Sequence, residues 1–163
     1  MIAKLILGAC IALAPQAAPT GNEPVRGTES GFWKHHSVVY AQVTDVSSVR
    51  PGLAKMTLAV MATLAGWMDA AENPRLEVDL LHGVQISAVA ELPKPKTRVV
   101  ALVMRWGDDS YTIRSSPVVF MPNQAAILQV KSFDAPEVQE IIGHLRELRS
   151  RKATPEAKES KGE

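Results

Sequence analysis

The strongest candidates for metal chemistry in this chain are two adjacent histidines. His35 and His36 form the only paired imidazole in the sequence, and imidazole nitrogens are common metal ligands. No Cys, Asp or Glu lies within three residues of the pair, and metal sites usually space their ligands so that they share one face. His35 and His36 are therefore either part of a metal site or the polar entry into the first strand.

The strongest candidates for partner binding are the three tryptophans. Trp33 precedes the first expected strand, Trp67 lies in a long connection, and Trp106 lies at an expected hairpin tip. Tryptophans in loops can anchor a partner, but they can also pack down as a lid over one end of a barrel. We favour the lid. An exposed cluster of all three at one end would instead indicate a partner or glycan site.

Other catalytic arrangements are not apparent in the sequence. It contains no G-x-S-x-G, no P-loop and no G-x-G-x-x-G. Asp108 and Asp109 form too short a cluster for a calcium loop of about a dozen residues and fit a hairpin turn instead. His82 and His144 are expected at a strand-end turn and on a helix surface. We therefore predict no catalytic residue and no cofactor.

Composition limits the classes of partner. The formal net charge is +1, from 18 basic and 17 acidic residues, so the chain as a whole does not attract nucleic acid or an anionic membrane. Lys94, Lys96 and Arg98 form the only basic cluster, and aromatic residues make up 5% of the chain. Single-stranded nucleic acid requires a basic groove with interleaved aromatic residues. No nucleic-acid partner is expected.

The first residues read as an export signal. Lys4 precedes an apolar run over residues 5–14, and small residues follow, so residues 1–18 are predicted to be a signal peptide. The run is shorter than the about 20 residues that span a bilayer. Cys10 closes a lipobox-like sequence, so lipidation or a retained segment are alternatives. We expect a secreted or periplasmic protein, with a lipoprotein as the alternative, that contacts a membrane only through this segment.

The rest of the chain is predicted to form one domain between two flexible stretches. Residues 19–34 are rich in proline, glycine and polar residues and are expected to be a flexible spacer. A single β-rich domain is predicted over residues 35–152, and 46% hydrophobic residues suffice for its core. Residues 153–163 are polar and expected to be disordered. Without Cys10, the mature domain has no thiol.

The domain is predicted from two hydrophobic periods. Alternation with a period of two indicates strands near residues 37–44, 56–64, 76–81, 98–105, 111–114, 118–120 and 126–130. Residues 98–105 are apolar on both faces, which places that strand centrally. Residues 65–74 have room for one helical turn. A helical period then covers residues 134–151, with Asp134 as the expected N-cap and Pro136 in the first turn.

These elements predict a mainly β fold with one C-terminal α-helix, either a barrel, OB-like in its strand count, or a small sandwich. Three segments carry a weak resemblance to uncharacterised small secreted bacterial β-domain proteins: Ala62-Thr63-Leu64-Ala65-Gly66, Val119-Phe120-Met121-Pro122 and Phe133-Asp134-Ala135-Pro136. The organisation is also faintly similar to OB-like netrin and metalloproteinase-inhibitor modules. No activity or site residue follows from either resemblance.

Two functions remain as hypotheses. The first is a non-catalytic exported β domain that binds an extracytoplasmic protein or envelope component, because an export signal and a β pattern occur without a catalytic motif. The second is a metal-assisted or hydrolytic extracytoplasmic enzyme that uses His and Asp or Glu side chains. The sequence does not identify a ligand for either.

Overall fold

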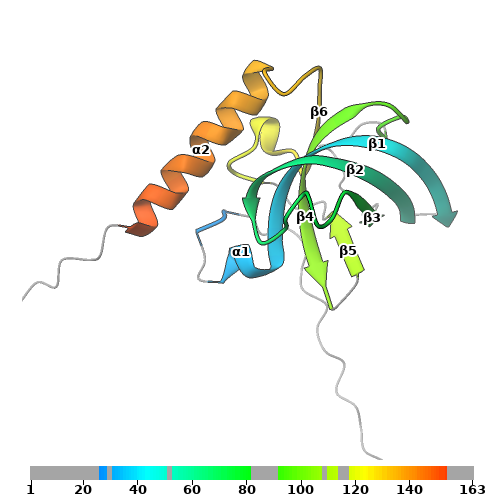
Figure 1. The fold of residues 1–163 in the computed structure, drawn as a ribbon, viewed down its shortest axis with the longest axis horizontal. Coiled ribbons are helices and arrows are strands. Elements are labelled where there is room, and N and C mark those ends of the chain that lie inside the picture. The colour runs from blue at the N-terminus through cyan, green and yellow to red at the C-terminus, as the bar shows by residue number, and fades with distance from the viewer. Residues whose placement is uncertain are drawn as a thin grey trace, which may run out of the picture.

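The computed structural model describes residues 26–28, 31–50, 53–81, 92–107, 110–113 and 118–153, and it shows a closed β-barrel with an added strand and a C-terminal helix (Figure 1). The strands are β1 (His36–Arg50), β2 (Leu53–Gly66), β3 (Arg75–Leu81), β4 (Arg98–Trp106), β5 (Ser110–Ile113) and β6 (Ile127–Val130). The helices are α1 (Phe32–His35), η1 (Pro122–Gln124) and α2 (Pro136–Ala153).

Five strands close the barrel. Their order is β1-β2-β3-β5-β4, and β4 pairs antiparallel with β1 to complete the circle. All pairs are antiparallel except β3 with β5, where Asp79 lies opposite Thr112 and Leu80 opposite Ile113. The prediction of a mainly β fold with a C-terminal helix is confirmed. A single closed sheet also decides between the two expected architectures in favour of a barrel.

The barrel strand β5 and the added strand β6 share one edge of β4. β1 occupies one edge of β4 along residues 98–104, so β5 and β6 must both pair with the other edge. β5 takes the C-terminal half of β4, and β6 takes the N-terminal half. The chain between β5 and β6, which we call the excursion, leaves the barrel wall and returns to the same edge of β4. It therefore supplies residues for a second layer outside the barrel.

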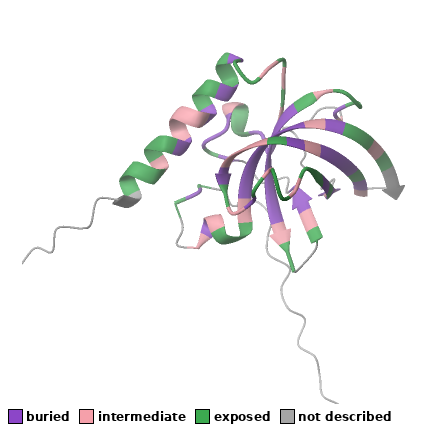
Figure 2. Ribbon diagram, viewed as in Figure 1, coloured by how far each residue is buried: buried purple, intermediate pink, exposed green. Residues whose placement is uncertain are grey.

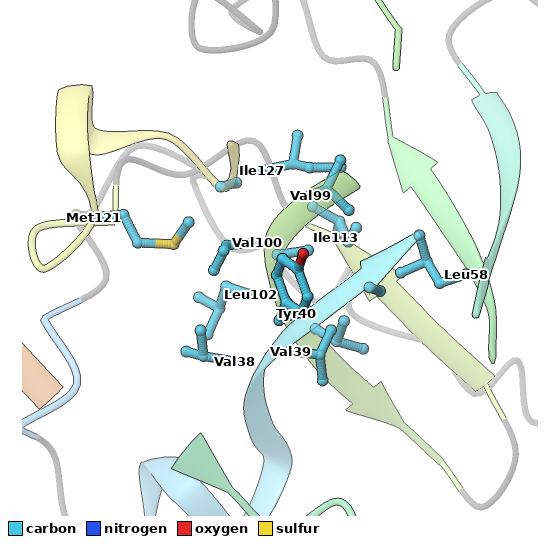
Figure 3. Packing of buried hydrophobic residues seen from close by; sticks show 14 of the residues in the cluster. Val38, Val39, Tyr40, Leu58, Val99, Val100, Leu102, Ile113, Met121 and Ile127 are labelled. Atoms are coloured by element: carbon cyan, nitrogen blue, oxygen red, sulfur yellow. The ribbon is translucent and has the colours of Figure 1, made fainter. Parts of the chain in front are cut away.

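The central position predicted for residues 98–105 is confirmed, because β4 contacts three strands and is buried along most of its length. On the inside of the barrel, Val39 lies with Leu58 and Ile113 (Figure 3). On the outside of the same strands, Val38, Val100 and Leu102 lie toward Met121 from the excursion (Figure 3). β4 is apolar on both faces because each face has its own core.

α2 covers this outer layer. It buries Val138, Ile141 and Leu145 and leaves the opposite side exposed, as a surface helix must (Figure 2). The prediction of a C-terminal helix is confirmed, but its start is corrected. The carbonyl of Ala135 accepts the first helical N–H groups, from Val138 and Gln139, so Ala135 rather than Asp134 takes the cap position. Pro136 then occupies the first helical position, where a backbone N–H would have no partner within the helix, so the missing N–H of proline costs no hydrogen bond.

Three local predictions are also corrected. β1 does not end near Asp45 but runs to Arg50, because a register shift leaves Thr44 without an opposite residue and the pairing continues with Asp45 opposite Thr57. Residues 118–120 form a turn and a single bridge rather than a strand, with Val118 and Phe120 buried in the core and Val119 exposed. Residues 65–74 contain a turn but no helix.

The folded part of the chain begins earlier than residue 35. Phe32 opens α1 and is buried, and Gly27 is buried beside Phe120, although the flexible spacer was expected to extend to residue 34. The predicted signal peptide with Cys10, the tail after residue 153, His82 and Asp108-Asp109 lie outside the described residues. In the described part of the chain, no helix has the length and apolar character needed to span a bilayer.

Candidate functional site

One end of the barrel gathers most of the aromatic residues. It is formed where β1 begins and where β2 and β4 end, because His36 lies opposite Met104 and Ser37 lies opposite both Gly66 and Val103. We call it the aromatic end. Of the eight Trp, Tyr and Phe residues in the chain, it holds five. They are Phe32, Trp33, Trp67, Trp106 and Tyr111.

Ser37 fixes the start of the connection that carries Trp67. Its side chain is fully buried, and its hydroxyl oxygen accepts the backbone N–H groups of Trp67 and Met68, both at 3.1 Å. Gly66 makes the preceding bend with a φ of 107°. A Cβ at that position would collide with the backbone of His36 and with Ser37, so glycine is required there.

Trp67 packs against the core and contacts two residues of the β4–β5 hairpin. Its ring stacks on that of Tyr111, with centroids 6.0 Å apart and planes 15° apart. The guanidinium carbon of Arg105 lies 5.2 Å from the Trp67 ring centroid, within the range of a cation–π contact. Arg105 and Tyr111 face each other across the β4–β5 pair. These contacts hold Trp67 against the core, and the lid role expected of the tryptophans stays a prediction.

Trp33 belongs to a second, adjoining cluster. It meets Phe32 edge-on at 4.8 Å between centroids and lies 5.8 Å from Phe120. Phe32 in turn stacks on the imidazole of His36, with centroids 4.0 Å apart and planes nearly parallel. Trp33 is only partly exposed. Its contacts anchor α1 to the outer layer, which is a structural role.

Trp106 differs from the other two tryptophans because its side chain is 65% exposed. It ends β4 and lies opposite Ser110, the first residue of β5. Beyond this pair the β4–β5 hairpin turns, and in Figure 1 these two strands reach the lower limit of the barrel. Trp106 therefore projects from the aromatic end instead of packing into it.

The two candidate metal ligands, His35 and His36, lie in different environments. His35 is exposed on α1, whereas the Nδ1 atom of His36 lies 3.0 Å from the carbonyl oxygen of Phe32 and its ring is stacked. Among the described residues, no three His, Cys, Asp or Glu side chains gather in a group that would hold a metal ion. The arrangement around His36 supports the polar entry into β1.

The sequence did not single out four residues that build this end: Phe32, Ser37, Arg105 and Tyr111. A signal for two of them was present. Arg105 lies two residues before the expected Gly107–Ser110 turn and Tyr111 one residue after it, and antiparallel pairing brings positions that flank a hairpin turn together. Ser37 and Phe32 had no such signal, because their partners are set by the way β2 and α1 fold back.

The basic cluster lies away from the aromatic end. Lys94, Lys96 and Arg98 are at the start of β4, whereas Trp106 is at its finish. β4 has nine residues from Arg98 to Trp106, so its two ends lie about 26 Å apart. This cluster therefore does not share a surface with Trp106. The outer faces of β2 and β3 instead pair opposite charges, with Lys55 4.0 Å from Asp79.

No known protein family matches the chain, and no curated protein is detectably similar to it.

Proposed function

We propose that this chain is a non-catalytic extracytoplasmic binding module that contacts a protein or an envelope component through its aromatic end. Two parts of the proposal come from the sequence, namely the export signal over residues 1–18 and the lack of a catalytic motif. The barrel is OB-like in this proposal, and OB-like barrels commonly bind ligands through the loop between their fourth and fifth strands. Trp106 lies at that loop.

The exposure of Trp106 is the observation that carries the proposal. The other exposed large hydrophobic residues among those described, Met61, Val119 and Phe133, are isolated or next to residues of the outer layer. Trp106 instead follows Arg105, which is held over Trp67, and Trp67 is stacked on Tyr111, so the strand end that carries Trp106 is well ordered. A large exposed aromatic side chain on an ordered strand end is typical of interface anchors.

The test is site-specific photo-crosslinking in the cells that produce the protein. The full-length chain would carry a photoreactive phenylalanine analogue at position 106 or, as control, at position 61 on β2, where the native methionine is 53% exposed. We expect a discrete adduct from position 106 in the extracytoplasmic fraction and none from position 61. Equal labelling from both positions, or an adduct confined to the cytoplasm, would refute the proposal.

A further inference from the structure

We propose that Met61 is the residue at which peroxide oxidants modify this protein, and that the barrel stays folded when they do. The reaction transfers one oxygen atom from hydrogen peroxide to the Met61 sulfur, so the thioether becomes a sulfoxide and the peroxide becomes water. The sulfur loses two electrons and the peroxide gains them, so the reaction needs no other reactant. This inference goes beyond the proposed binding function and does not depend on it.

Exposure separates Met61 from the other methionines. The sequence contains six methionines, and all except Met1 lie in the described part of the chain. Met61 is 53% exposed, whereas the other four described methionines are between 1% and 8% exposed. These four are Met56, Met68, Met104 and Met121. Because an oxidant must reach the sulfur atom, the exposed thioether is expected to react first.

A β-bulge explains the exposure of Met61. Tyr40 of β1 lies opposite Ala62 of β2. The next residue of β1, Ala41, lies opposite Val60, so the pairing skips Met61. The extra residue of a bulge has no cross-strand partner of its own. The Met61 side chain is therefore not part of a cross-strand pair.

The other edge of β2 also changes its neighbour near this point. In the described part of the chain, β2 pairs with β3 only as far as Ala59, which lies opposite Arg75. The N–H of Val60 then donates to the carbonyl oxygen of Pro74 at 3.0 Å. Met61 follows the end of this pairing, so it lies in a part of β2 that the described residues of β3 do not accompany.

These surroundings suit a sulfoxide, whereas those of the buried methionines do not. At Met61 the new oxygen would lie in water, which can hydrogen-bond to it. Met56, by contrast, lies between Val46 of β1 and Val78 of β3. A sulfoxide there would bury a polar oxygen among apolar side chains, so Met56 can react only when the barrel opens.

Peptide mass spectrometry of the purified full-length protein after timed exposure to hydrogen peroxide tests the proposal. We expect the sulfoxide to form at Met61 at least about 10-fold faster than at any of the four buried methionines. A buried methionine that reacts as fast as Met61 would overturn the proposal.

The same reaction in urea above the unfolding midpoint tests whether the fold causes the selectivity. We expect all five methionines to react within about 3-fold of one another there, because unfolding exposes every sulfur. Selectivity for Met61 that persists in the unfolded chain would contradict the structural explanation.

Two variants and one stability measurement complete the test. Met61→Leu should lose the fast oxidation, and the control Met56→Leu should keep it. The protein oxidised at Met61 alone should melt within about 2 °C of the untreated protein, because a change on an exposed side chain alters stability little. Fast oxidation that persists in Met61→Leu, or a melting temperature lowered by more than about 10 °C, would refute the assignment of Met61 as a tolerated oxidation site.

Discussion

The substitution Ser37→Ala tests how the aromatic end is held together. The Ser37 hydroxyl oxygen is the acceptor for two consecutive backbone N–H groups, at the point where the chain leaves β2 and turns over the barrel. Alanine keeps the fold of β1 and fills almost the same volume, but it removes the shared acceptor. The loss therefore reports on these two hydrogen bonds and hardly on packing.

The two N–H groups differ in how much their loss costs. The bond to Met68 is buried, so its N–H would be left without a partner, at about 1–3 kcal/mol. The bond to Trp67 is only partly buried, and water can replace part of it, which lowers that loss to about 1 kcal/mol. Together they predict a decrease of about 2–4 kcal/mol in the free energy of unfolding.

Urea denaturation followed by tryptophan fluorescence measures the effect. With an m-value of about 1.5 kcal/mol/M, a loss of about 3 kcal/mol lowers the midpoint by about 2 M. Ser47→Ala on the exposed part of the same strand is the matched control and should change the free energy of unfolding by less than about 0.5 kcal/mol. If Ser37→Ala behaves like Ser47→Ala, the two hydrogen bonds do not hold the connection.

Three further outcomes are expected. Gly66→Ala should prevent folding, because the added Cβ collides with the backbone of His36 at a positive φ, whereas circular dichroism should show Gly143→Ala folded like wild type, since its Cβ meets open space. Ile141→Ala should lower the free energy of unfolding by about 2–5 kcal/mol in urea titrations, because Ile141 is fully buried in the α2 stripe; a loss under about 0.5 kcal/mol would contradict the packing of α2 on the outer layer. The intact mass of the protein from fractionated cells should lack roughly the first 14 to 20 residues outside the cytoplasm; a full-length mass in the cytoplasm would contradict export.

The sequence predicted the strands that have one buried face and one exposed face. Val78 and Leu80 alternate with Glu77 and Asp79 in β3, and the barrel buries the first pair. The α2 stripe was predicted for the same reason, since Val138, Ile141 and Leu145 recur at helical spacing. Such periods are local properties, so a single chain reveals them without knowledge of what the element packs against.

The sequence did not predict features that depend on distant partners. Residues 118–120 look like a strand by composition, but Phe120 is packed under α2 and near Trp33, so the segment turns instead. Asp45 looks like a strand end, yet the pairing of β1 with β2 continues past it after a register shift. In both cases tertiary contacts outweighed the local preference.

The candidate site was predicted in part. All three tryptophans singled out in the sequence lie at or adjoin one end of the barrel, but their exposures differ. Trp67 is half-buried because Tyr111 and Arg105 reach it from another hairpin, and Trp33 is half-buried because Phe120 reaches it from the excursion. Residue type alone cannot separate these two from Trp106, since the difference lies entirely in the neighbours.

The pairing of β1 with β4 also determines when the barrel can form during synthesis. β1 must wait for β4, whose pairing with it completes the circle, and the β3–β5 contact consists of two residue pairs in the described part of these strands. Pairings between strands so far apart in the chain form on the millisecond to second scale, not in microseconds. Until β4 has emerged, the long β1–β2 ribbon carries a free edge. This interval is when the chain is most open to strand-to-strand aggregation.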